Sequence, residues 1–413
     1  MTIANGLFKQ VAIKVESAYG APPGQSGAQL LRRVESTIDL AKDSYESQEK
    51  RTDFQVADAR HGVRRVEGQV SGELSPKTYS DQFAAILKRD FAAITALTGV
   101  GITIAGSGPA YTVTRAAGSW LTDGVKVGDV IRLTTGTLNA ANINKNLLVA
   151  DVTSATVLSV LVVNGSSLVA EGPISGCGVS WPGKKTFVPQ TGHTDKSFSI
   201  EHFFADISQS ELFTGIKFGK ASLQLPPTGN ATVSFDAQGK DLMETAAKRG
   251  GVATTAQYFT SPTALTSTST LTAVNGIVRM GGVSVAVLTG LTLDIESAMS
   301  GEPVVGSNTI PQKFPGKVTA KGNATAYFED AVMRDAFVNE TDIDIVAIFT
   351  SDNSATADFI TFVMPRVKLM SANKDDPDSG VVQTLQFQAL LNNAGGAGVK
   401  TEKTTISIQD SAS

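Results

Sequence analysis

The sequence predicts an all-β protein built largely from a duplicated module. It contains 39 glycines among 413 residues, its apolar runs are short and alternating, and few stretches show the period of an amphipathic helix. Alternating runs recur roughly every 8–12 residues, as sandwiches and small barrels require. The clearest runs are Val63–Leu74, Ile216–Leu225, Ala231–Phe235, Val283–Leu288 and Ile343–Phe349.

One order of elements occurs twice. Residues 37–91 begin with the alternating strand Thr37–Leu40 and continue through a polar loop and further strands to a short helix. Residues 292–337 repeat that order from Thr292–Ile295, through a loop rich in glycine and proline. A duplicated β-module without catalytic residues inside the repeat indicates a building block.

After its first strands, each repeat is expected to form a short helix whose single apolar stripe covers an open face of the sheet. Both helices are expected to close on a similar phrase. The stripes are Tyr79, Phe83, Ile86 and Leu87, and Phe328, Val332, Met333 and Phe337; the phrases are Leu87–Phe91 and Met333–Phe337.

Charge density divides the first half of the chain. Residues 31–92 carry 22 charged side chains, whereas residues 97–183 carry eight and consist of closely spaced predicted strands. This shift predicts a small β-domain inserted in a loop of the first module. The predicted strands of the insert are Ile102–Ile104, Tyr111–Arg115, Val130–Leu133, Leu147–Val152 and Val157–Val162.

The resulting domain organisation has four parts. Residues 1–96 and 184–250 form a discontinuous first module, and residues 97–183 form the insert. Residues 251–391 form the second module, and residues 392–413 are expected to be a loosely held tail rich in small residues.

Composition limits the class of function. The formal charge of −4, from 35 basic and 39 acidic residues, does not predict a basic nucleic-acid-binding surface. Cys177 is the single cysteine, so an intrachain disulfide is excluded. Residues 1–20 lack a signal-peptide pattern, and the apolar stretch Val157–Val163 is too short to span a membrane. We therefore expect a soluble protein made in a reducing cytoplasm, without membrane contact.

The residue types of catalytic and metal sites occur without the required spacing. His61, His193 and His202 form no metal-ligand pattern, and Cys177 is expected to be a small buried apolar residue. The glycines of Gly99–Gly101 and Gly106–Gly108 are expected to form turns between strands, because no P-loop lysine follows them. No catalytic residue, metal or cofactor is predicted.

The acidic cluster Asp375–Gly380 leaves two interpretations open. It resembles ordinary hairpin-turn chemistry, and three carboxylates could also hold Ca²⁺. It lacks the downstream glutamate of an EF-hand loop, so the turn is favoured.

The segment Asp43–Arg65 mixes many charges of both signs. It is either a solvated loop or a docking loop whose charges fix the register against a neighbour. The corresponding loop Met299–Gly316 carries few charges, so the two loops suit unlike partners. The candidates for an assembly interface are Lys50, Arg51, Asp53, Arg60, Arg64, Val304, Val305 and Asn308.

Several phrases, taken in order, resemble the tail tube (major tail) proteins of long-tailed bacteriophages. The opening Val11–Pro22 contains Glu16, Tyr19 and Gly20 in the spacing Glu-x-x-Tyr-Gly. The other phrases are Pro303–Asn308, Gly316–Thr319, Tyr327–Phe328, Phe359–Val367 with Met364-Pro365, and Phe387–Leu390. Residues 97–183 depart from the family's minimal pattern and resemble the small barrel or immunoglobulin-like decorations of some tails, through Tyr111–Arg115, Trp120–Gly124 and Val127–Ile131.

The resemblance implies two tail-tube β-sandwich or barrel modules, each flanked by a short helix, whose inner strands join neighbours around a lumen. Six modules normally form a ring, so two modules in each chain imply a trimer with pseudo-sixfold symmetry. The implied partners are further copies of the chain within and between rings, the tape measure protein, and the tail terminator and distal tail proteins. DNA would pass through the lumen during ejection without specific binding. The implied location is the virion tail, with the host cytoplasm during assembly.

Two other classes of function fit the sequence less well. A bacterial surface or adhesive β-sandwich protein is the alternative, but the missing signal peptide and the nested domain count against it. A glycan hydrolase on a β scaffold is disfavoured because no carboxylate pair has a recognisable setting.

Overall fold

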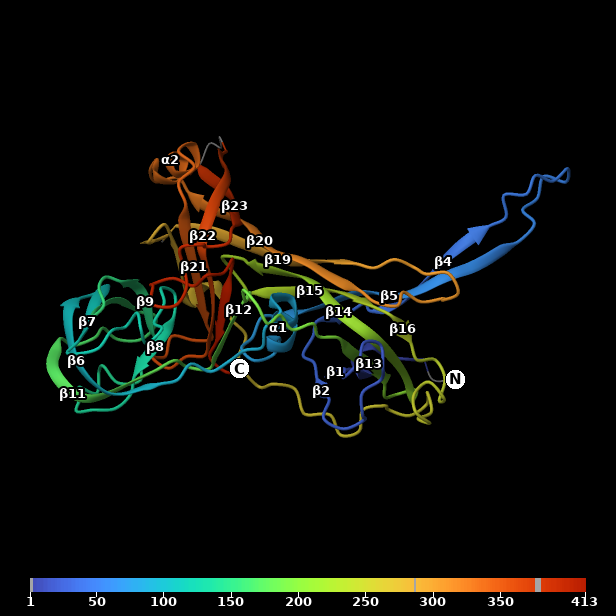
Figure 1. Ribbon diagram of the computed structural model, residues 1–413, viewed down its shortest axis with the longest axis horizontal. Helices are drawn as coiled ribbons and strands as arrows, with labels where there is room; N and C mark the ends of the chain where they lie inside the picture. The colour runs from blue at the N-terminus through green and yellow to red at the C-terminus, as the bar shows by residue number, and fades with distance from the viewer. Residues whose placement is uncertain (1–2, 286, 376–379) are drawn as a thin grey trace.

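The structure is a computed structural model that describes residues 3–285, 287–375 and 380–413 (Figure 1). Strands dominate this part of the chain, and its α-helices are α1 (Ser80–Leu87) and α2 (Val332–Val338). Short 3-10 turns occur at Gly6–Phe8 and Ala273–Asn275. The all-β prediction is confirmed.

Eight antiparallel strands form one continuous sheet that runs through both halves of the chain. The halves meet where β14 pairs with β19, from Lys220 opposite Glu296 to Leu225 opposite Leu291. In spatial order the strands are β4 (Asp39–Glu46), β5 (Ala59–Glu73), β15 (Thr232–Gly239), β14 (Gln209–Leu225), β19 (Leu288–Ser300), β20 (Phe314–Tyr327), β23 (Val382–Ala389) and β22 (Phe359–Lys374).

Further strands extend this sheet from β14 and β22. The first half of β14 pairs with β13, which pairs with β1, and the first half of β22 pairs with β21, which pairs with β17. Each half of the chain therefore contains six strands with the same order along the chain and the same pairings. They are β1, β4, β5, β13, β14 and β15 in the first half, and β17, β19, β20, β21, β22 and β23 in the second. The bounds are β1 (Lys9–Val15), β2 (Gln29–Leu30), β3 (Glu35–Ser36), β12 (Lys184–Phe187), β13 (Phe198–Phe204), β16 (Asp241–Leu242), β17 (Gly276–Met280), β18 (Val283–Ser284), β21 (Ile343–Thr350) and β24 (Ser407–Asp410).

A closed six-stranded barrel lies at one end of the molecule (Figure 1). It has its own apolar core, which includes the fully buried Trp120 and Cys177. The chain enters and leaves the barrel side by side, because Ala92 and Lys185 exchange two backbone hydrogen bonds of 2.9 Å. The barrel strands are β6 (Leu97–Ser107), β7 (Ala110–Arg115), β8 (Val130–Leu133), β9 (Leu147–Val152), β10 (Val157–Val162) and β11 (Glu171–Ser180).

The barrel packs firmly against the second half of the chain. Asn146 donates a hydrogen bond of 2.8 Å to the Ala357 carbonyl, and Arg279 donates one of 2.9 Å to the Ala150 carbonyl. A second apolar cluster fills the contact, so removal of the barrel would uncover a hydrophobic patch on β21 and β22. That cluster consists of Val130, Leu148, Val346, Ile348, Phe359 and Val363.

The apolar stripe of α1 is buried as expected. Phe83 packs against Phe235 and Phe362, with ring centroids 5.2 and 6.0 Å away, so α1 joins the two halves of the chain. The expectation for the second helix is wrong in part. Met333 contacts the core, but 57% of Val332 and 39% of Phe337 remain exposed.

The predicted equivalence of the two helix phrases is also wrong. Leu87 is the last residue of α1, so most of the first phrase lies beyond the helix, after Lys88 in the left-handed conformation. The second phrase, Met333–Phe337, lies inside α2. The phrases share composition and occupy different parts of the helix.

Two further expectations need correction. The tail is held firmly from Thr404 onward, because β24 pairs with β12 and β22 and buries Ile406 and Ile408 completely. Gly99 and Gly101 lie within β6, where the pairing with β11 is irregular, and Gly108 lies in the turn to β7. Composition alone does not reveal a long-range strand pair or a bulge.

We expect Ile408→Ala to lower the free energy of unfolding by about 2–5 kcal/mol, because it leaves a cavity in the core. Val399→Ala, in the exposed part of the same segment, should change it by less than about 0.5 kcal/mol. Urea denaturation of both variants measures the difference. Equal effects would contradict a structural role for β24.

Candidate assembly surfaces

The β4–β5 hairpin projects from the molecule at the end opposite the barrel (Figure 1). Its tip, residues 47–58, carries exposed apolar side chains among its charges. Phe54 is 98% exposed and Val56 63%. Sequence reasoning identified the charges of this loop and missed Phe54, although an aromatic residue within a polar loop is itself a signal of contact.

Three of the predicted charged candidates near the tip, Arg51, Asp53 and Arg60, form local ion pairs. Arg51 lies 2.9 Å from Asp53, and Arg60 lies 2.7 Å from Asp58. The hydrogen bonds from Arg51 hold the pKa of Asp53 below its usual value. Lys50 is exposed beside them. The tip therefore presents exposed apolar side chains, Phe54 and Val56, beside charges that are largely paired locally.

Arg64 is a contact within the chain at the base of the hairpin. Its guanidinium pairs with Asp241 and Glu244, and its backbone N–H donates to the Asn308 carbonyl at 2.8 Å. Two predicted candidates, Arg64 and Asn308, therefore meet and tie the β19–β20 loop to the hairpin. Val304 and Val305 remain exposed in that loop.

One face of the eight-stranded sheet is polar along its whole width. It lies opposite the face that packs on the core, as the alternation of a half-buried sheet requires. Its acidic and basic side chains are close to balance, because Arg65 beside Glu67 and Lys368 opposite Gln388 lie on the same face as the six carboxylates and two lysines in the set that follows. Besides Arg65 and Lys368, the polar face consists of Asp39, Glu67, Gln69, Ser71, Glu73, Lys220, Ser222, Gln224, Thr232, Ser234, Asp236, Gln238, Thr292, Asp294, Glu296, Thr319, Lys321, Asn323, Thr325, Ser371, Asn373, Thr384, Gln386 and Gln388.

The sheet ends in two free edges. Within the described residues, β4 pairs only with β5, and the segment Ser371–Lys374 of β22 pairs only with β23. Each edge presents unpaired backbone donors and acceptors, which form a template for another strand.

The Glu-x-x-Tyr-Gly phrase fixes the opening arm to the body. The Glu16 carboxylate accepts hydrogen bonds from the Gly20 and Gly215 N–H groups and from the hydroxyls of Ser197 and Ser199, at 2.6–2.8 Å. Burial raises the pKa of Glu16, and these bonds oppose that rise. The phrase therefore has a structural role in this chain.

The remaining candidates are the three histidines and the single cysteine. His202 is buried, and burial followed by the charges of Lys9 and Arg33 lowers its pKa to about 3. His61 and His193 are exposed, and Cys177 is buried as expected. Among residues 3–285, 287–375 and 380–413, no group of three or more His, Cys, Asp or Glu side chains could hold a metal ion.

The predicted acidic turn falls only partly within the described residues. Residues 376–379 of the predicted turn or Ca²⁺ site lie outside the described residues. Asp375 accepts a hydrogen bond of 2.6 Å from the Val382 N–H, which joins β22 to β23.

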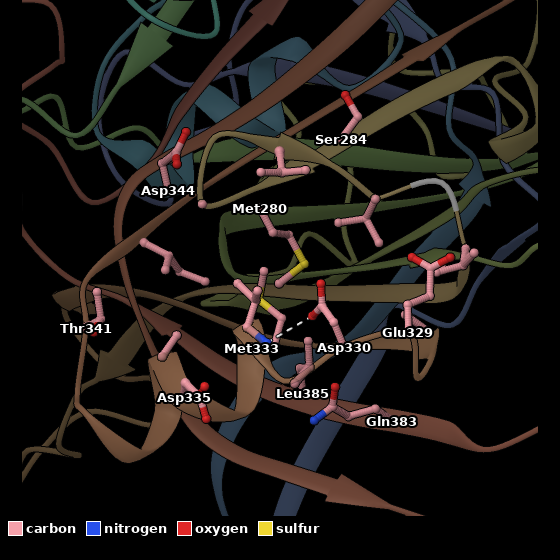
Figure 2. A pocket seen from close by; sticks show the side chains of 18 of the residues that line it. Met280, Ser284, Glu329, Asp330, Met333, Asp335, Thr341, Asp344, Gln383 and Leu385 are labelled. Carbon is pink, nitrogen blue, oxygen red and sulfur yellow. Dashed lines mark hydrogen bonds between the residues drawn. The ribbon is translucent and has the colours of Figure 1, made fainter.

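A cavity of about 690 Å³ opens between α2 and the sheet (Figure 2). Met280, Met333 and Leu385 form its apolar wall, and Glu329 and Asp330 lie at its side. It adjoins the helix face that the chain leaves exposed.

The fold and these surfaces define a β-sheet structural protein with open edges and a polar sheet face. The family model described as "Phage tail tube protein" matches residues 9–389, so the chain belongs to the phage tail tube protein family. Membership makes it a structural component of the virion tail that assembles into a tube. A comparison with curated proteins finds no significant match.

No helix in the described part of the chain is long and apolar enough to cross a membrane.

Arg64→Ala should lower the free energy of unfolding by about 3 kcal/mol, because it leaves the mostly buried Asp241 with the more distant Lys248 as its neighbouring cation. Arg60→Ala is the matched control on the same strand, and its exposed pair should contribute less than about 1 kcal/mol. Thermal and urea denaturation of both variants test this. A larger loss from Arg60→Ala would contradict the assignment.

Proposed function

We propose that this non-enzymatic protein assembles into closed rings of three chains, which stack into the hollow tail tube and form a conduit for DNA ejection. The proposal rests on one observation: a single eight-stranded sheet with a free edge at each side and a continuous polar face. Closing a ring satisfies both edges, whereas an open array would aggregate.

Three copies would give a barrel of 24 strands, eight from each chain. With strands about 4.8 Å apart and tilted about 40°, its backbone diameter is about 50 Å. Such a barrel holds a lumen, because barrels beyond about 16 strands already enclose aqueous channels.

We assign the polar face to the wall of this lumen. Its near balance of acidic and basic side chains avoids the extensive counterion release that makes a strongly basic wall hold phosphates. DNA can then pass without being bound.

The hairpin tip supplies the contact between rings in this proposal. Arg51, Asp53 and Asp58 are paired locally, and the exposed Phe54 and Val56 can bury against the next ring. The exposed Val304 and Val305 of the second loop offer a different surface, so the six positions of a ring alternate.

The chain divides in this proposal into a first module of residues 1–96 and 184–250, a barrel domain of residues 97–183, and a second module of residues 251–391. The tape measure protein would occupy the lumen, and the terminator and distal tail proteins would cover the ends of the tube. The host cytoplasm is the place of assembly.

Electron microscopy of the purified protein tests the proposal. We expect annuli and hollow rods at high concentration. A strictly monomeric protein under those conditions would contradict it.

Phe54→Ser should leave rings intact and shorten or abolish rods, because it removes the most exposed apolar side chain of the hairpin. Phe54→Tyr retains an aromatic ring and is the matched control. Rod length by negative-stain microscopy and the melting temperature separate stacking from folding. Rods of unchanged length from Phe54→Ser would argue against the hairpin as the stacking contact.

A further inference from the structure

The long strands β14 and β22 correspond residue by residue. Each has one irregularity in its pairing with the next strand, between Phe218 and Lys220 in β14 and between Leu369 and Ser371 in β22. Since a bulge marks a fixed position in a strand, Lys220 corresponds to Ser371. Two residues further on, Ser222 corresponds to Asn373.

The correspondence continues across the sheet to β4 and β19. Phe218 pairs with Ala237, which pairs with Gly68 on its other side. In the second half, Leu369 pairs with Phe387, which pairs with Gly322. Gly68 therefore corresponds to Gly322.

The neighbouring partner residues complete the match, because Glu67 pairs with Asp39, and Lys321 pairs with Asp294. The register therefore matches Asp39 with Asp294.

The glycines confirm this alignment independently. A Cβ atom at Gly68 would clash with the carbonyl oxygen of Thr37, and a Cβ atom at Gly322 would clash with that of Thr292. The same close approach recurs two residues before each aspartate.

The junction between the two halves is therefore a template for the free edges. In it β14 pairs with β19, with Ser222 opposite Asp294, and Lys220 lies 3.3 Å from Asp294. The counterpart of β14 is β22, and the counterpart of β19 is β4. These are the strands with free edges.

We propose that β22 of one copy pairs antiparallel with β4 of the next copy in the register of the internal junction. This inference rests on the proposed function and names the residues of its ring contact. The four backbone pairs are Ser371 with Ala41, Ala372 with Leu40, Asn373 with Asp39, and Lys374 with Ile38.

The side chains at these positions suit the register. Leu40 and Ala372 are partly buried and pack on the core, whereas their counterparts Ile295 and Ala221 are fully buried at the internal junction. Joining two copies would bury both. Asn373 and Asp39 are exposed on the polar face, where the amide can donate to the carboxylate.

The surroundings of the two helices also support pairing of β22 with β4 of the next copy. Strands β19 and β22 of the second half cover α1, with Phe362 against Phe83. Within the described residues no following half covers α2, which exposes Val332 and Phe337 beside the cavity of Figure 2. The first half of the next copy takes that position in the proposed ring.

A cysteine pair tests the register. In the double variant Asp39→Cys/Asn373→Cys, the two Cα atoms would lie about 4.5–5.5 Å apart across the contact, within disulfide range. Mild oxidation of assembled protein should convert most chains into covalent oligomers that close at three. Native Cys177 is fully buried and does not compete.

Two controls use the same chain. Ser222→Cys/Asp294→Cys should form its disulfide within one chain, without an increase in mass. Asp39→Cys/Ser371→Cys lies two residues out of register and should cross-link at least about tenfold less, because diagonal neighbours are about 7–8 Å apart.

The outcomes separate the two proposals. Rings that form by microscopy but cross-link better through Asp39 and Ser371, or through neither pair, overturn the register and leave the tube assignment standing. A protein that remains monomeric, with the internal disulfide formed, overturns both.

Discussion

The structure depends on the satisfaction of backbone hydrogen bonds at the edges of one sheet. The β14–β19 junction joins what would otherwise be two open edges, so the two halves of the chain form a single sheet. Within the described residues, the same constraint leaves β4 and the segment Ser371–Lys374 of β22 with unpaired edges. In the proposed ring, neighbouring copies complete the two edges of each sheet.

The barrel is part of this construction. Lys185, on the strand that leaves the barrel, pairs with the buried Asp129 of the barrel at 2.5 Å and with Glu402 of the C-terminal segment at 3.1 Å. Burial opposes the charge of Lys185, yet the two carboxylates raise its pKa, so the ion pairs are retained at neutral pH. Breaking such a buried network by removing one partner is costly. The barrel, the sheet and the C-terminal segment therefore stabilise one another.

Local patterns predicted the parts of the fold that local chemistry determines. Strands Val130–Leu133, Leu147–Val152 and Val157–Val162 have the predicted bounds, because each is a short apolar run flanked by polar or glycine-rich turns. Thr37–Leu40 and Thr292–Ile295 proved equivalent by strand register. The helix phrases did not, because similar composition can occur at either end of a helix.

Long-range pairing accounts for what the sequence could not provide. The tail consists of small residues, and only its contact with β12 and β22 makes it a buried strand. The sequence predicted Arg64 as a charged residue of an assembly interface, whereas in the fold it forms an ion pair with Asp241 of the same chain. Phe54 stands in the sequence as an aromatic residue within a polar loop, but the prediction considered only the charged residues around it.

The number of chains in the smallest closed ring tests the central claim most directly. Native mass spectrometry of rings released from the tube should give three chains, because two equivalent junctions for each chain, one internal and one between copies, complete a pseudo-sixfold sheet. Six chains in a ring would show that each chain contributes one module to the barrel, and would contradict the continuous eight-stranded sheet as the unit of the wall.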